Sequence, residues 1–156
     1  MKKFTLIINI ILLITWMGVI FNFSNDIGSV SAHKSDRLLI RIVETVKKEK
    51  LTQEQKEEII KKYGPVIRKL AHMFLYFILS ILSFALLYRF YKLKPVTIIY
   101  TLIFCFIYAC TDEIHQIFVS DRGPSIVDVL IDSLGSLIFL ILPSLILLKR
   151  KIVTNK

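Results

Sequence analysis

The stretch from residue 111 to residue 132 reads TDEIHQIFVSDRGPSIVDVLID, and apolar runs lie on both sides of it, at residues 95–110 and 129–148. The stretch carries one histidine, one glutamine, one arginine and five acidic residues: His115, Gln116, Arg122, Asp112, Glu113, Asp121, Asp128 and Asp132. Ionisable groups are costly at the mouth of a membrane-spanning segment, and those found there are usually functional. The stretch therefore predicts a polar site between two spanning helices.

The composition of the whole chain indicates a membrane protein. Of its 156 residues, 54% are hydrophobic, a share too high for an ordinary soluble domain. A helix needs about 20 apolar residues to cross a bilayer. Four runs reach or approach this length, at about residues 4–23, 70–88, 95–116 and 126–148. The sequence thus predicts an all-α fold, an integral membrane four-helix bundle formed by a single domain over residues 1–156.

The distribution of charge predicts the partner and the orientation. The net charge is +9, but the basic residues form no single patch with interleaved aromatics, so a nucleic-acid partner is not expected. They gather at the ends of the apolar runs, as the positive-inside rule favours. Three such groups contain no acidic residue: Lys2 and Lys3; Arg89, Lys92 and Lys94; and Lys149, Arg150, Lys151 and Lys156. We therefore expect both termini in the cytoplasm and the polar site on the outer side.

The first loop, residues 24–69, is expected to hold one or two short amphipathic helices. Apolar residues fall on one helical stripe at Leu39, Ile42, Val43 and Val46. Thr52 and Gln55 form a capping-box pattern, and Gly64-Pro65 is expected to end the helix that begins there. These helices would rest on the outer leaflet or cover the mouth of the bundle. A solvated pair of charged helices is the alternative.

The start of the second run supplies a basic stripe. Arg68, His72 and Tyr76 are spaced i, i+4, i+8 and share one helical face, with Lys69 beside them. With alternating spans, this stripe and the acidic stretch reach the same side of the membrane and should converge on one pocket. The candidate chemical groups are His72, Asp112, Glu113, His115, Asp128 and Asp132. The candidate ligand-binding groups are Arg68, Lys69, Tyr76, Gln116 and Arg122.

The acidic residues of this pocket need a counter-ion. Asp128 and Asp132 are one helical turn apart and repel each other in isolation. Arg68 and Arg122 could clamp the phosphate of an anionic lipid while Asp–His pairs act as acid and base. A divalent metal held by the histidines and carboxylates is a second reading, although no H-E-x-x-H pattern is present and no other cofactor is predicted. The third reading is a non-catalytic binding or scaffold protein whose arginines only neutralise the acids. The sequence leaves open whether the protein is an enzyme.

At these residues the chain resembles the VanZ-like membrane protein family. The motifs that carry the resemblance are Phe23-Ser24, Arg68-Lys69-x-Ala71-His72-x-x-x-Tyr76, Asp112-Glu113-x-His115-Gln116-x-Phe118, Arg122, and Asp128-x-x-x-Asp132-x-x-Gly135. The resemblance implies a four-helix protein of the bacterial plasma membrane, and the namesake gives low-level resistance to teicoplanin, a lipoglycopeptide antibiotic. From the residues and the resemblance together we expect an anionic envelope lipid, or a lipid-linked cell-wall intermediate, as the ligand. The long basic loop departs from the family pattern.

Overall fold

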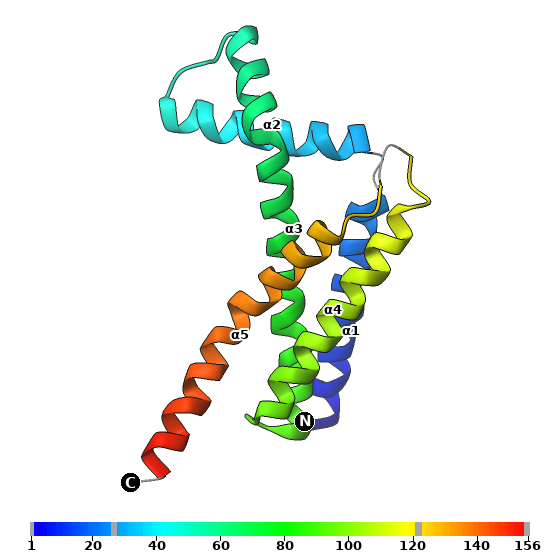
Figure 1. Cartoon of the computed structure of the whole chain (residues 1–156), viewed down its shortest axis with the longest axis vertical. Helices are drawn as coiled ribbons and strands as arrows, with labels where there is room; N and C mark the ends of the chain where they lie inside the picture. The colour runs from blue at the N-terminus through cyan, green and yellow to red at the C-terminus, as the bar shows by residue number, and fades with distance from the viewer. Residues whose placement is uncertain (1, 26–27, 121–122, 155–156) are drawn as a thin grey trace.

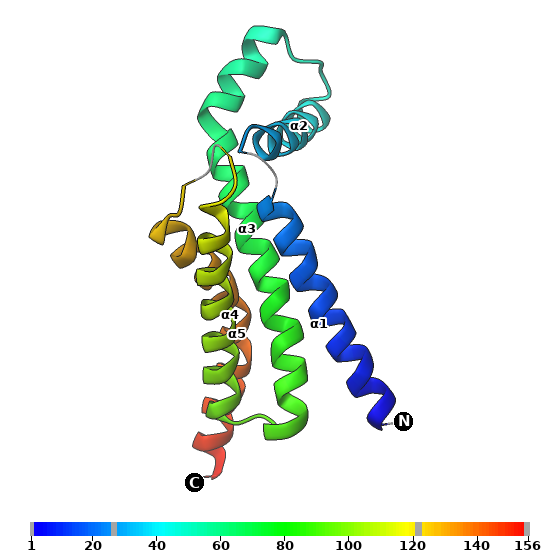
Figure 2. The same ribbon diagram turned by 90° about the vertical axis from the view of Figure 1, so that its right-hand side faces the viewer.

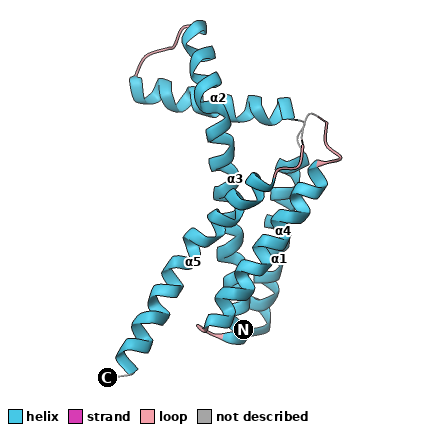
Figure 3. Cartoon of the chain, viewed as in Figure 1, coloured by secondary structure: helices cyan, strands magenta, loops and turns pink. Residues whose placement is uncertain are grey.

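The computed structural model describes residues 2–25, 28–120 and 123–154, and every regular element in these ranges is a helix. In chain order the helices are α1 (Lys2–Asn25), α2 (Gly28–Lys47), α3 (Gln53–Tyr91), α4 (Pro95–Gln116) and α5 (Ile126–Thr154). In Figures 1 and 3, α1, α3, α4 and α5 run along the length of the molecule, and α2 lies across α3. The all-α fold predicted from the sequence is confirmed.

Four of these helices, α1, α3, α4 and α5, are long and apolar enough to cross a membrane. The predicted third span coincides with α4, and the other three helices extend beyond the predicted runs. Both termini and the short α3–α4 turn lie at one end of the bundle, as Figures 1 and 2 show. The C-terminal ends of α1 and α4, the start of α5 and the whole of α2 lie at the other end. This arrangement places the basic stripe of α3 and the acidic residues of α4 and α5 at the same end.

Helix α3 is much longer than the predicted second span. It has 39 residues, which corresponds to roughly 58 Å, and so it continues well beyond a bilayer at its N-terminal end. We expected Gly64-Pro65 to end a separate short helix, and that expectation is wrong, because Pro65 lies inside α3. A proline inside a helix removes one backbone hydrogen bond and strains the preceding turn, but packing can offset this.

That packing comes from the crossing of α2 over α3. Gly64 is buried, and a Cβ atom placed on it would lie 2.7 Å from Asp36 Oδ1 of α2. The missing side chain therefore allows α2 to approach the α3 backbone closely, and this contact stabilises the helix beside Pro65. Where the sequence predicted one or two short helices in the first loop, the structure has one helix of 20 residues, α2, and the N-terminal part of α3.

The connection between α2 and α3 is fixed by hydrogen bonds to side chains. The predicted capping box is present, with Thr52 Oγ1 accepting from the Gln55 backbone N–H and the Gln55 side chain accepting from the Thr52 N–H. Glu44 near the end of α2 accepts from the Leu51 N–H at 3.2 Å and pairs with Lys56 at 3.3 Å. The Leu51 hydrogen bond first, and then Lys56, hold the pKa of the Glu44 carboxyl below its usual value. The charged carboxylate thus joins the end of α2 to the start of α3.

Helix α2 has the amphipathic character predicted for the loop. Leu39 is buried at 6% exposure, whereas Leu38, Ile42 and Val46 remain exposed. The helix lies crosswise to the spanning helices at one end of the bundle (Figures 1 and 2). A crosswise helix with an exposed apolar edge and basic residues is typical of a helix that lies in the membrane interface.

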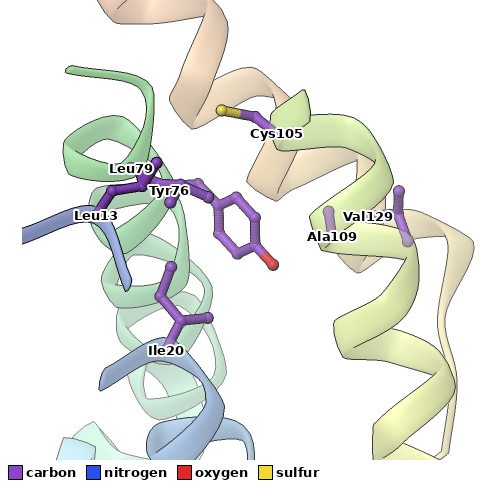
Figure 4. Close-up of a cluster of buried hydrophobic side chains, with 7 residues drawn as sticks. All are labelled: Leu13, Ile20, Tyr76, Leu79, Cys105, Ala109 and Val129. Atoms are coloured by element: carbon purple, nitrogen blue, oxygen red, sulfur yellow. The ribbon is translucent and has the colours of Figure 1, made fainter. Parts of the chain in front are cut away.

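The core lies where the four spanning helices meet. Figure 4 shows a cluster of buried side chains from all four, namely Leu13, Ile20, Tyr76, Leu79, Cys105, Ala109 and Val129. Near this core, Trp16 Nε1 of α1 donates to the Leu75 carbonyl of α3 at 2.9 Å, and the Tyr108 hydroxyl of α4 donates to the Met17 carbonyl of α1 at 2.7 Å. Large apolar side chains are exposed along the outside of the spanning helices, as expected of surfaces that face lipid.

Candidate functional site

A polar cavity of about 230 Å³ lies between α3, α4 and α5. It is lined by Arg68, Lys69 and His72 of α3, by Glu113 and Gln116 of α4, by Gly123, and by Asp128, Ile131 and Asp132 of α5. Three helices that are far apart in sequence therefore supply basic, acidic and amide groups to one space. Seven of the residues that the sequence placed in one pocket line this cavity, namely Arg68, Lys69, His72, Glu113, Gln116, Asp128 and Asp132.

Two of the carboxylates in and around this cavity have hydrogen-bond partners that fix their position. Asp112 Oδ2 accepts from Ser24 Oγ of α1 at 2.6 Å, and both residues are buried. Glu113 Oε2 accepts from the backbone N–H of Ser125 at 2.8 Å, just before α5 begins. Both bonds go to a charged acceptor and are therefore stronger than a neutral hydrogen bond.

The start of α5 shows why Asp128 can serve as an ion-pair partner. Ser125 Oγ accepts from the Asp128 backbone N–H at 3.3 Å, which is half of the capping box that the sequence suggested. The other half is replaced, because Glu113 occupies the Ser125 N–H. The Asp128 carboxylate instead pairs with Lys69 Nζ at 2.9 Å. This pair is partly exposed, so it stabilises the fold only modestly.

A second group of side chains lies where α3, α4 and α5 meet. His72, Asp112 and Asp132 each present a nitrogen or oxygen atom, and these atoms all lie within 4.8 Å of one another. Asp112 and Asp132 are 4% and 1% exposed. Within the described ranges, Asp132 Oδ1 is buried and accepts no hydrogen bond. His72 and Asp132 also line the polar cavity, so this group of three adjoins it.

Two predicted site residues point elsewhere. The His115 ring stacks on Phe21 of α1, with ring centroids 4.3 Å apart, and it does not line the polar cavity. Tyr76 is fully buried in the core between the helices, with its ring 6.2 Å from that of Tyr108 (Figure 4). The predicted Arg122, and Asp121 beside it, lie outside the described residues.

An apolar cavity, also of about 230 Å³, adjoins the same part of α3. It is lined mainly by apolar side chains of α1, α2 and α3, including Phe23, Leu38, Ile67, Phe74 and Leu75. Arg68 and His72 line this cavity as well as the polar one. Since Leu38 and Phe74 are 53% and 60% exposed, this apolar cavity borders the lipid-facing surface of the bundle.

Sequence reasoning did not place Ser24, Ser125 or the apolar cavity in the site. Ser24 belongs to the motifs that carry the family resemblance, but its partner Asp112 lies 88 positions away in the sequence. A serine at the end of an apolar run is common at helix ends, so the residue type alone carries no signal. Its burial at 0% exposure is the feature that distinguishes it, and burial depends on how α1 packs.

Comparison with known proteins gives one family match. The family model described as VanZ/LLP1 matches residues 9–147, nearly the whole chain. No curated protein and no solved structure matches. The matched range includes all of α3 and α4, most of α1 and α5, and every residue of the polar cavity.

Proposed function

The chain belongs to the VanZ/LLP1 family, and we propose that it binds or acts on an anionic envelope lipid or lipid-linked cell-wall intermediate at the outer leaflet of the bacterial plasma membrane. The observation that carries this proposal is the pair of adjoining cavities. One is polar and the other apolar, and Arg68 and His72 line both. A molecule with a charged headgroup and an acyl chain matches such a pair, since each part meets an environment of its own polarity.

Arg68 is the residue that best supports an anionic headgroup. Its Nε is buried and has no hydrogen-bond partner among the described residues. An unpaired buried donor of this kind is costly, and a phosphate oxygen is a favourable acceptor for a guanidinium. The carboxylates of the cavity would repel an anion, but two of them already have partners. Glu113 accepts a hydrogen bond from the Ser125 backbone N–H, and Asp128 forms an ion pair with Lys69.

The lipid proposal is tested by counting retained lipids on purified protein. Wild type, taken from a mixed bilayer, should retain phosphatidylglycerol over phosphatidylcholine in native mass spectrometry. Arg68→Gln should weaken retention of phosphatidylglycerol by about 10-fold, because one hydrogen bond to a charged group is lost. Lys149→Gln is the matched control, since it removes one positive charge from an exposed site at the other end of α5. Equal retention by wild type and both variants would contradict the proposal.

Binding and catalysis are separated by stoichiometry. Incubation with labelled envelope lipids, including a lipid-linked cell-wall precursor, should yield more product than protein if the chain is an enzyme. Retention without turnover supports a non-catalytic binder that shields or redistributes these lipids. In both cases we expect expression to raise resistance to teicoplanin slightly, through an altered cell surface, and Arg68→Gln to remove that effect.

The orientation is a separate prediction with its own measurement. In a background lacking Cys105 and Cys110, a membrane-impermeant maleimide added to intact cells should label Ser120→Cys but not Lys94→Cys. Both positions are exposed, and they lie on opposite sides of the span formed by α4. The reverse labelling would place the polar cavity in the cytoplasm and exclude an outer-leaflet ligand.

A further inference from the structure

The group of His72, Asp112 and Asp132 has the composition and spacing of a metal site. We propose that these three side chains bind one divalent transition-metal ion, Zn²⁺ or Mn²⁺, next to the polar cavity. The imidazole and carboxylate atoms lie within 4.8 Å of one another. Donors held by one ion at about 2.0–2.2 Å in tetrahedral geometry lie about 3.3–3.6 Å apart, so the group would have to close by up to about 1.5 Å when the ion binds. One imidazole with two carboxylates suits both ions.

An independent observation is that one oxygen of Asp132 lacks a hydrogen-bond donor. Its residue is 1% exposed, and its Oδ1 accepts no hydrogen bond from any described residue. A buried carboxyl oxygen without a hydrogen-bond donor is unfavourable, because it has lost its contact with water and has no partner in the protein to replace it. The side chain lines the cavity at the same point as His72. An ion bound there would supply the missing partner.

The surrounding charges also favour a cation. Asp132 interacts electrostatically with Asp112, Glu113 and Asp128, and all three are acids. Lys69 is already paired with Asp128, and within the described chain no lysine or arginine forms an ion pair with Asp132. A divalent ion would neutralise the formal charges of Asp112 and Asp132 together, which removes most of the cost of burying them.

The group also has the hydrogen bond that metal-binding carboxylates commonly receive from a neighbour. Ser24 Oγ donates to Asp112 Oδ2 at 2.6 Å and holds this carboxylate in one orientation. Three protein ligands leave further coordination positions open, as in catalytic metal sites. The positive charge of an ion here would also make this side of the polar cavity attract a phosphate, which the carboxylates alone would repel. The metal site nevertheless does not depend on the lipid proposal.

The proposal is tested on the full chain in detergent, purified with a tag that contains no histidine. After treatment with EDTA and its removal, titration with Zn²⁺ and with Mn²⁺ should give one ion per chain by elemental analysis for at least one of them. His72→Gln and Asp132→Asn should each weaken binding by more than about 10-fold, since each removes a direct ligand. Glu58→Gln is the control, because it removes the same formal charge from an exposed residue of α3 that lines neither cavity. It should bind the ion nearly as wild type does.

A second measurement guards against variants that fail to fold. Circular dichroism and elution volume identify folded samples, and Co²⁺ added to folded wild type should give visible absorption bands that His72→Gln lacks. Binding of no ion by wild type would overturn the proposal, as would equal binding by wild type, His72→Gln and Asp132→Asn. Failure in this experiment leaves the lipid test on Arg68→Gln unaffected, so the two proposals can fail separately.

Discussion

Gly135→Ala is expected to lower the free energy of unfolding by about 3 kcal/mol or more, at the upper end of what overpacking costs. Gly135 lies where α5 crosses α3, and a Cβ atom there would clash with the Met73 carbonyl oxygen and lie 2.9 Å from its carbonyl carbon. Both obstructing atoms belong to backbone, which cannot rotate away as a side-chain end can. The helices would have to separate, and their contact includes the hydrogen bond from Ser80 Oγ to the Ser136 carbonyl.

The measurement is thermal or denaturant unfolding of the purified protein in detergent, followed by circular dichroism. Gly18→Ala is the matched control, because an added Cβ atom there meets nothing within 4 Å and the residue also lies inside a spanning helix. Alanine is a better helix former than glycine, so this control should be neutral or slightly stabilising. A Gly135→Ala protein as stable as the Gly18→Ala protein would mean that α3 and α5 do not cross as described.

The fold was predictable because apolar runs of sufficient length have few alternatives in a bilayer. The backbone must satisfy its own hydrogen bonds there, so each run becomes a helix. The predicted end of a helix at Gly64-Pro65 was wrong, because the pattern of neighbouring residues conflicted with the packing of α2 on α3. Gly64-Pro65 is a typical end for a helix, but α2 crosses α3 at Gly64, and that contact cannot be deduced from neighbouring residues.

The order of the spanning helices was enough to predict which segments of the chain form the site. Alternating spans bring the start of α3, the end of α4 and the start of α5 to one end, so seven predicted residues line the same cavity. The topology alone did not predict which face of α4 points toward the cavity. Successive residues turn by about 100°, so Glu113 and His115, both expected in the pocket, cannot share one face of α4. In the structure Glu113 lines the cavity, and His115 lies against Phe21 of α1.

Tyr76 illustrates a limit of the i, i+4, i+8 rule. Each step of four residues turns the helix by about 40° beyond a full turn and advances it by about 6 Å. Tyr76 therefore lies about 12 Å deeper than Arg68 and about 80° around the helix, enough to move it from the cavity to the core. Arg68 and His72, one step apart, both line the cavity. Residues spaced i, i+4 therefore share a helical face, whereas residues spaced i, i+8 can face different surroundings.

Ser24→Ala is expected to lower the free energy of unfolding by about 2 kcal/mol, because a hydrogen bond to a charged, buried carboxylate contributes about 1.5–3 kcal/mol. Ser24 is fully buried, and its hydroxyl donates to Asp112 across the interface of α1 and α4. Removal of the hydroxyl leaves one oxygen of Asp112 without this donor. The measurement is reversible unfolding in detergent with EDTA present, so that no bound ion contributes to the difference.

Two further variants separate this bond from a general weakening of α1. Asn22→Ala is the matched control, because Asn22 is exposed and its side chain donates only within its own helix, to the Gly18 carbonyl. Its effect should lie within about 0.5 kcal/mol of zero, as for an ordinary surface substitution. In an Asp112→Asn background, Ser24→Ala should cost only about 1 kcal/mol, since the remaining bond joins neutral groups. If the cost is the same in both backgrounds, Ser24 stabilises α1 by packing alone. Helix α1 would then contribute nothing to the position of Asp112, and only α3 and α5 would hold the group in place.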